Sequence, residues 1–444
     1  MPTNNPFTAA EQSNAQRVYL ETTAKIYQNQ SDVWGMASDW DQTPINYLGV
    51  KVPLELSPNP SLAAIDLDGG ATPTIGSRNL DSMTVTYGAL MQARGTTYGA
   101  RLNNNKETAE NELTASVESD MKQFVAYLNA YASRGNGTHA LADISANYGT
   151  PDNDSARCNG TYDSIGVSQL VVNGNYKFYN AAGTTQRTGT VGAAAIQMTS
   201  KDSSDANFAS NIPSDVVATD IIVPEINVTD AATGFVAGLP YIIDSSGTYF
   251  GKSRSSFTGL QAYENALSGA LTASALMSTY AGMKQRGGYF ANGFGDDLLE
   301  ALWILVNISG WQTYYNLSLN SGAAVGGLRS IQNTGNNPGL DLGFKDVEFT
   351  WFGAPIKCCN HTRGDEIYFL NKKYLKKAVL KDVGAIAMPN AVDPMLVNSS
   401  GQYILANANY HDFVGQFFSP TPHKLGKISA VQFSGVATQK AAQV

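Results

Sequence analysis

A chain of 444 residues is longer than one average domain, so two or three compact units are expected. Hydrophobic residues make up 43%, enough for packed cores, but only 15% are charged, well below the roughly 25% of ordinary globular proteins. The formal net charge of −8 argues against a protein that coats nucleic acid with its whole surface. Much of the surface must therefore be covered by uncharged polar residues or lie against partners.

The cysteines and the apolar segments bear on where the protein works. Three cysteines, of which Cys358 and Cys359 are adjacent, cannot form a disulfide framework. The start, "MPTNNPFTAAEQSNAQ", lacks the basic and apolar regions of a signal peptide. The most apolar run, Leu298 to Val306, is interrupted by Glu300 and is too short to span a bilayer. We therefore expect a reduced, soluble, intracellular protein with no membrane partner.

Residues 1–65 predict an extended N-terminal arm. Their aromatic residues are isolated, and Pro53, Pro58 and Pro60 interrupt the run "VKVPLELSPNPS", which argues against a regular element there. An arm of this kind is stable only if it lies along another surface.

Residues 66–105 predict a polar hairpin. The stretch "DSMTVTYGALMQARGTTYGARLNN" alternates as strands do, with Met83, Val85 and Tyr87 on one face and Thr84 and Thr86 on the other. The segment has too few apolar residues for a core of its own, and an isolated two-stranded ribbon is only marginally stable in water. The hairpin therefore predicts a partner surface, such as a neighbouring copy of the chain.

A long amphipathic helix is predicted over about residues 105–134. Six apolar residues spaced three and four apart form one helical stripe: Leu113, Val117, Met121, Phe124, Leu128 and Tyr131. Asn104 and Glu107 form a capping box at its start, and Gly135 follows its end. At ~1.5 Å per residue the helix would be roughly 45 Å long. The stripe is narrow, so we expect one face to pack on a sheet and the other to face water.

The remaining chain mixes short strands and helices. Residues 136–215 are rich in Gly, Ser, Thr and Asn, and "VNGN" predicts a tight hairpin turn. "DIIVPEINV" predicts a buried strand and "GLPYIIDSSGTYFG" another hairpin. Helices are expected from Thr272, as N-cap, to Arg286, and from about Asp296 through "DDLLEALWILVN". Strands return from residue 344.

Two motifs suggest chemistry that their context does not support. "GTYFGKS", residues 247–253, resembles a phosphate-binding loop but has one residue too few between its glycines, and no helix is expected after it. Cys358, Cys359 and His361 resemble metal ligands, but neighbouring side chains on a strand point to opposite faces. A nucleotide-dependent enzyme is thus a weak alternative, and we expect no catalytic residue, metal or cofactor.

Arg363-Gly364-Asp365 raises a different alternative, a secreted adhesion or binding module. Several Asn-x-Ser/Thr sequons, among them Asn29 and Asn136, agree with it. The simpler interpretation is a charged turn between the two strands of a hairpin, "WFGAPIKC" and "EIYFLN".

A basic run, "NKKYLKKAVLK", contains Lys372, Lys373, Lys376 and Lys377. In a helix these lysines would stack in pairs on one face. The simplest interpretation is a solvated face, and the functional one is a patch facing packaged nucleic acid or an acidic neighbour.

The order of these elements resembles the Hong Kong 97 fold of tailed-bacteriophage major capsid proteins, an α+β fold. The stretch "FKDVEFTWFGAPIKCCNHTRGDEIYFLNKKYLKKAVL" is similar to the late segment of that family, whose second strand corresponds here to Gly364, Ile367, Tyr368, Phe369 and Leu370. "GLPYIIDSSGTYFGKSRS" and "LTASALMSTYAGMKQRGG" look like segments of its central region.

The resemblance implies a division of the chain and a set of partners. Residues 1–65 would be the N-terminal arm, 66–105 the E-loop, 106–219 the peripheral domain with its spine helix and an insertion, 220–340 the axial domain, and 341–444 late strands returning to the peripheral domain and a tail. The chain would assemble with itself as pentamers and hexamers into an icosahedral virion shell in the host cytoplasm, enclosing double-stranded DNA bound without sequence specificity. A scaffolding protein, a portal and a decoration protein are further partners that it allows.

The implied intersubunit contacts lie in the E-loop: Arg78, Tyr87, Arg94, Tyr98 and Arg101. Some relatives cross-link an E-loop lysine to a neighbour, but no lysine lies between residues 66 and 105. The shell would therefore be held by non-covalent contacts. The N-terminus also lacks the coiled-coil pattern of a cleaved scaffolding region, which implies a separate scaffolding protein or none.

Overall fold

The computed structural model is a mixed α+β protein with many strands and few helices. It describes the following residues: 33–40, 49–57, 61, 64, 76–77, 79–97, 122–148, 154–158, 167, 169–189, 192–201, 205–225, 230–286, 301–320, 349–359, 361–385, 395–397 and 403–433. None of the helices in this part of the chain combines the length and the apolar character needed to cross a bilayer.

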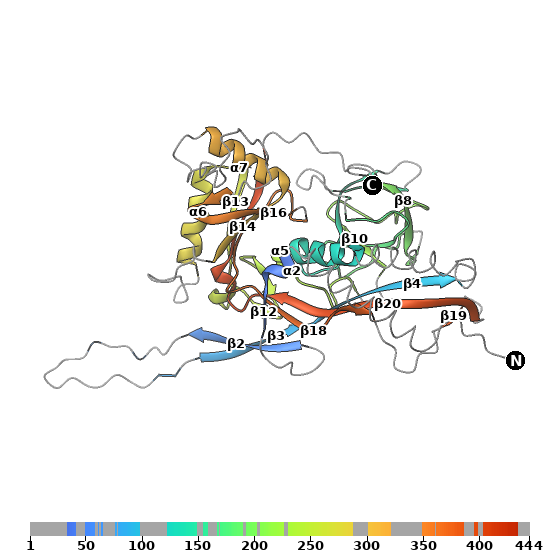
Figure 1. The fold of residues 1–444 in the computed structure, drawn as a ribbon, viewed down its shortest axis with the longest axis horizontal. Helices are drawn as coiled ribbons and strands as arrows, with labels where there is room; N and C mark the ends of the chain where they lie inside the picture. The colour runs from blue at the N-terminus through green and yellow to red at the C-terminus, as the bar shows by residue number, and fades with distance from the viewer. Residues whose placement is uncertain are drawn as a thin grey trace, which may run out of the picture.

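A long sheet forms the base of the molecule, drawn along the bottom of Figure 1. Its strands run in the order β1-β18-β20-β19, with β4 paired along the other side of β20. Their bounds are β1 (Ser38–Asp39), β4 (Gly88–Thr97), β18 (Lys376–Ala385), β19 (Met395–Val397) and β20 (Tyr403–Phe418). With 16 residues at ~3.3 Å each, β20 spans roughly 53 Å and sets the long axis of the sheet. Trp34, in the one-turn helix α2 (Val33–Met36), packs edge-on against Phe413 of β20 with 5.0 Å between ring centroids.

The segment expected as an arm and a separate hairpin forms one ribbon. β2 (Gly49–Ser57) pairs antiparallel with β3 (Asn79–Thr86), whereas β4 pairs with β20 and not with β3. The prediction of no regular element around Pro53 is therefore wrong, and so is the hairpin within residues 66–105. A proline is tolerated because, among the described residues, β2 has a ladder partner on one side only, so that the missing N–H can face away from it.

The amphipathic helix is present and ends where the sequence predicts. Residues 122–134 are helical and Gly135 follows; the predicted start and the first half of the apolar stripe lie outside the described residues. Phe124, Leu128 and Tyr131 are buried as expected. The predicted wet face is wrong for the final turns, however, because Ala130, Ala132 and Ser133 are buried too.

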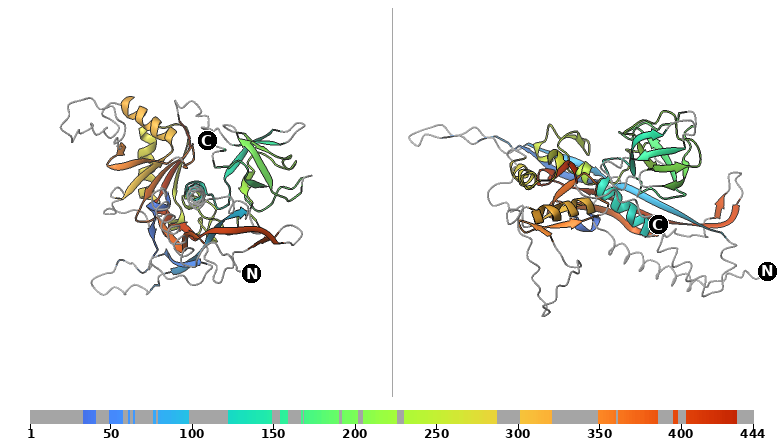
Figure 2. Two further views of the ribbon diagram at one scale, coloured as in Figure 1. Left: turned by 45° about the vertical axis from the view of Figure 1, so that its right-hand side comes forward. Right: turned by 90° about the horizontal axis from the view of Figure 1, so that it is seen from above.

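The Gly/Ser/Asn-rich segment forms a closed β-barrel that packs beside this helix. The barrel order is β10-β5-β6-β9-β8-β7. Its strands are β5 (Ala142–Tyr148), β6 (Ser155–Cys158), β7 (Asn175–Tyr179), β8 (Ile196–Lys201), β9 (Asp205–Phe208) and β10 (Ile221–Pro224). Tyr127 of the helix packs against the hydrophobic core that contains Tyr176 of β7. The left view of Figure 2 shows the helix end-on between the barrel and the rest of the body. "VNGN" is a turn with Asn173 at φ 68°, but only β7 on its C-terminal side is a strand.

The third unit is a six-stranded sheet with the order β13-β21-β17-β14-β16-β15, packed against two helices. Its elements are β13 (Tyr263–Ala270), α6 (Ala273–Gln285), β14 (Leu302–Val306), α7 (Ile308–Asn320), β15 (Phe349–Trp351), β16 (Ala354–Cys358), β17 (Ile367–Asn371) and β21 (Gly426–Gln432). The hydroxyl of Thr272 accepts a hydrogen bond from the Ala275 N–H at 3.1 Å, which confirms the predicted cap of α6.

Several predictions for this unit are corrected. The apolar run "LWILV" is strand β14 rather than part of a helix, because it occupies the middle of the sheet, with β16 on one side and β17 on the other. β16 and β17 are therefore not a hairpin, since β14 lies between them. The late strands also divide: β15, β16, β17 and β21 belong to this sheet, and β18 to β20 belong to the long one. "GLPYIID" begins with the single helical turn α5 (Leu239–Ile242) instead of a strand.

Candidate assembly interface

The ribbon β2–β3 contains the first strand of the segment, residues 66–105, that the sequence points to as a contact with other subunits. Its inner face is packed in the chain's own core, with Val52 and Met83 directly opposite each other at 1% and 0% exposure. The outer face, with Thr84 and Thr86, is exposed, so the predicted alternation of β3 is confirmed. The expectation of a hairpin without a core is wrong for this part, because β2 supplies the apolar residues Val50, Val52 and Leu54.

The root of the ribbon is fixed by one buried amide. Gln416 of β20 is 0% exposed. Its Nε2 donates to the Thr86 and Phe235 carbonyls, both at 2.9 Å, and its Oε1 accepts from the Ala237 N–H at 2.7 Å. Gly88, the first residue of β4, lies so close to the Phe235 carbonyl that a Cβ atom would be 2.5 Å from its oxygen. The ribbon, β20 and the loop before α5 are thus joined at one point.

A second attachment lies farther along the ribbon and uses the motif that resembled a phosphate-binding loop. Residues 247–253 form a tight hairpin of β11 (Thr248–Tyr249) and β12 (Lys252–Ser253), followed by turns and a 3₁₀ helix η1 (Thr258–Leu260) rather than an α-helix. Lys252 Nζ lies 2.5 Å from Asp81 Oδ2 on β3. The hydrogen bond from Lys252 lowers the pKa of Asp81. The lysine therefore binds the ribbon of its own chain.

The predicted E-loop contact residues do not lie together on one exposed surface in the part of the chain that the structure describes. Tyr87 is buried at 9% exposure in the core of its own chain, and burial raises its pKa, so it is not available to a neighbour. Arg94 lies in β4, opposite Asn409 of β20. Arg78, Tyr98 and Arg101 lie outside the described residues.

The lysine run is not helical and does not form one face. Lys372 and Lys373 lie in the turn after β17, whereas Lys376 and Lys377 begin β18 and alternate across it. Lys376 Nζ donates to Ser38 Oγ at 2.8 Å, and Lys377 Nζ lies 3.5 Å from Asp39 Oδ1. Both therefore attach β1 to the long sheet.

Lys372 has a different environment from the lysines of β18. Its Nζ sits 2.9 Å from the ring centroid of Trp303, and Lys357 lies over the same ring at 5.8 Å. Burial, followed by the charge of Lys357, lowers the pKa of Lys372. Lys373 is exposed. Two ammonium groups gathered at one indole form a small basic, aromatic surface at the end of the sheet.

The segment "CCNHTRGDE" crosses from β16 to β17 and is mostly buried. Cys358, the last residue of β16, is exposed, and Cys359, which follows the strand, is buried. No cluster of His, Cys, Asp or Glu within the described ranges has the geometry of a metal site. Asp365 is 8% exposed and pairs with Arg363 at 3.6 Å. An adhesion tripeptide must present its carboxylate to a receptor, so Arg363-Gly364-Asp365 cannot act as one in this fold.

This segment instead contributes to a buried charge cluster between the helix, the barrel and the six-stranded sheet. Burial, and then the nearby Arg363, lower the pKa of Arg134 at the helix end to about 10. Burial raises the pKa of Asp365, although Arg363 opposes the shift. Tyr368 donates a hydrogen bond to Glu366, and Lys427 of β21 lies 3.2 Å from Glu264. Sequence reasoning missed this cluster because its members are distant in the chain.

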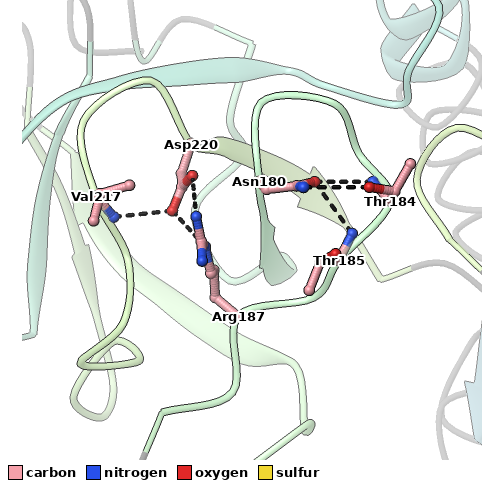
Figure 3. Close-up of polar contacts among 6 residues, drawn as sticks. All are labelled: Asn180, Thr184, Thr185, Arg187, Val217 and Asp220. Carbon is pink, nitrogen blue, oxygen red and sulfur yellow. Dashed lines mark hydrogen bonds and ion pairs between the residues drawn. The ribbon is translucent and has the colours of Figure 1, made fainter.

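The polar loops of the barrel are held by side-chain contacts of a structural kind (Figure 3). Arg187 binds Asp220 through two hydrogen bonds of 2.8 and 3.0 Å, and the same carboxylate accepts from the Val217 N–H at 2.9 Å. Asn180 Oδ1 accepts from the N–H groups of Thr184 and Thr185. The bonds of Asn180 and Val217 close turns and the Arg187–Asp220 pair joins two segments of the barrel, which explains how a Gly/Ser/Asn-rich segment forms a defined unit.

Comparisons with known proteins give structural relatives only. No protein-family profile and no curated protein sequence matches the chain. Among solved structures, the cyanophage A-1(L) capsid asymmetric unit covers 90% of this chain and 92% of its own at 10% identity, with a TM-score of 0.49. Gordonia phage Cozz covers 90% and 86% at 10% identity, with a TM-score of 0.42.

A third structure is the satellite phage P4 procapsid with its size determination protein, which covers 93% of this chain and 99% of its own at 8% identity, with a TM-score of 0.35. All three come from phages.

Proposed function

We propose that this chain is the major capsid protein of a tailed bacteriophage and assembles with itself into the icosahedral shell around a double-stranded DNA genome. The observation that carries the proposal is the ribbon β2–β3. Its base is packed in the core and fixed at Gln416, while Leu80, next to its outer end, is 62% exposed. A ribbon that is fixed at its base and exposes a large apolar side chain on its outer face is suited to contact a neighbouring copy.

The proposal assigns a role to each unit. In the Hong Kong 97 arrangement the E-loop corresponds to residues 49–86 rather than 66–105, because β2 is one of its strands. The long sheet, the helix 122–134 and the barrel make the peripheral part. The six-stranded sheet with α6 and α7 makes the axial part, which would gather at the centre of pentamers and hexamers. Identical contacts between copies then close a symmetric shell.

Of the predicted basic patch, the proposal keeps Lys372 and Lys373 as contacts to packaged DNA. Lys376 and Lys377 already bind Ser38 and Asp39. Lys373→Glu should lower the DNA content of particles without preventing shell formation, whereas unchanged DNA content would remove this contact from the proposal.

The decisive experiment shortens the ribbon without touching the core. Ser57 and Asn79 are paired directly, so an Asn-Gly turn can replace residues 58–78 and close a two-residue hairpin. We expect a folded chain that forms no closed shells, measured by sedimentation and negative-stain electron microscopy. A control variant carries Gly-Gly-Ser at residues 202–204, between β8 and β9, and should assemble as the wild type does.

Two results would contradict the proposal. One is normal shells from the variant with the shortened ribbon. The other is a wild-type chain that remains a monomer at every concentration.

A further inference from the structure

The contact between Lys252 and Asp81 lies where the ribbon leaves the body. On the inner face of β3, Val85 and Met83 are 0% exposed, and Asp81, the next residue outward on that face, has a side chain that is 34% exposed. Asp81 therefore lies at the outer limit of the buried part of this face, two residues beyond Met83. Its Oδ2 faces Lys252 at 2.5 Å, and its Oδ1 accepts from the Ser82 N–H at 2.6 Å. The carboxylate is therefore held in one orientation toward the lysine.

Lys252 is presented by a hairpin that is itself fixed to the core. The turn between β11 and β12 places Phe250 and Gly251 at φ 44° and 79°, and the Phe250 N–H donates to the Tyr241 hydroxyl at 2.8 Å. Tyr249 is 0% exposed and donates to the Ser419 carbonyl at 3.1 Å. Arg254, 1% exposed, donates to the carbonyls of Tyr241 and Leu260. The lysine thus extends from a rigid support.

Two attachment points define the direction of the ribbon. Thr86 is bound at the root by Gln416. Asp81 is five residues farther out, which is roughly 17 Å along a strand. At the root, Gln416 is fully buried, whereas the Lys252 and Asp81 side chains are 27% and 34% exposed. The outer point can therefore open, and is screened by salt, while the root stays in place.

We propose that Lys252 and Asp81 form a releasable latch that fixes the direction in which the β2–β3 ribbon leaves the body. In an assembly of the kind proposed above, the latch thereby sets the angle at which the ribbon reaches a neighbouring copy. Only this second part rests on the proposed function. Lys252 is in this sense a positioning residue.

The latch itself is tested on the unassembled chain by hydrogen exchange. Lys252→Met and Asp81→Asn should each speed exchange of the outer ribbon, residues 54–57 and 79–82, by about two- to fivefold, the range for partly exposed ion pairs. Exchange at residues 83–86, next to the root, should not change. The matched control is Lys284→Met, because Lys284 is also a half-buried lysine over an aromatic ring, 5.7 Å from Tyr280, compared with 5.8 Å for Lys252 and Phe257.

A double variant with the two charges swapped distinguishes the effect of the ion pair from the effect of packing. The double variant Lys252→Asp with Asp81→Lys should recover most of the lost protection, and Lys252→Met with Asp81→Asn together should be no worse than either alone. High salt should speed exchange of the wild type but not of Lys252→Met. Exchange in Lys252→Met that equals exchange in Lys284→Met would overturn the latch.

The effect of the latch on the angle of the ribbon is tested on assembled particles. If the wild type forms shells of one diameter, Lys252→Met should give a broader range of diameters. The double variant Lys252→Asp with Asp81→Lys should narrow that range again. Faster exchange with unchanged diameters would refute control of the angle while leaving the latch itself in place. A wild type that forms no particles would refute the proposed function, and the exchange result would still decide on the latch.

Discussion

Gln416→Leu should destabilise the chain strongly, because one side chain satisfies several buried main-chain groups. The amide bonds to the Thr86 and Phe235 carbonyls and to the Ala237 N–H, and Gln416 is 0% exposed. Leucine fills a similar volume but leaves these three polar groups, and the Phe417 N–H that also donates to the amide oxygen, without this partner. Each unsatisfied buried group costs about 1–3 kcal/mol, and the structure relaxes in part. We therefore expect the free energy of unfolding to fall by about 3–6 kcal/mol.

Urea unfolding of the unassembled chain measures this loss through tryptophan fluorescence. Trp34 packs against Phe417, the neighbour of Gln416, with 6.2 Å between ring centroids, so it reports on this part of the core. With a slope of about 2 kcal/mol per molar urea, the midpoint should fall by roughly 2 M.

The matched control is Gln261→Leu. Gln261 is half-buried and its Nε2 makes one hydrogen bond, to the Arg254 carbonyl at 2.8 Å. This variant should lose about 1 kcal/mol or less. Equal midpoints for the two variants would show that Gln416 does not fix the ribbon root in the way described.

Two further predictions concern thiols and pH. In the native chain only the exposed Cys358 should react with a thiol reagent, and Cys358→Ser should abolish this labelling; burial raises the pKa of Cys158 to about 12, and Cys359 is also buried. Rapid native labelling of Cys158 would contradict the barrel packing. Because Lys252 lowers the pKa of Asp81 below its ordinary 3.8, the stability from this pair is present above that value and is lost as the pH falls through the lowered pKa. Outer-ribbon protection, corrected for intrinsic exchange, should hold from neutral pH to about pH 5 and decline only below about pH 4, a decline that Asp81→Asn should lack.

Local patterns predicted those features that depend on residues close together in the chain. The cap of α6 at Thr272, the buried β10 and the end of the helix at residue 134 all follow from neighbours within a few positions. The alternation of β3 was also readable, because a half-buried strand must alternate. Such features can be predicted from the sequence because the residues that determine them are close neighbours in the chain.

Partner choice was not readable, since alternation shows that a strand has two faces but not which strand lies beside it. β3 pairs with β2 across the chain segment between them, and β4 pairs with the much later β20. The run "LWILV" has no period, so only its place between β16 and β17 decides that it is a strand. The barrel likewise depends on β5 meeting β10 at its other end.

The site residues divide in the same way. The sequence determined by itself that Met83 and Val85 lie on one face of β3 and Thr84 and Thr86 on the other, because side chains alternate along a strand. Only the tertiary structure decided that Tyr87 and Asp365 are buried, that Lys376 and Lys377 bind β1, and that Lys252 meets Asp81. Burial and ion pairing depend on which distant segments meet, and that is settled by packing the whole chain rather than by any local pattern.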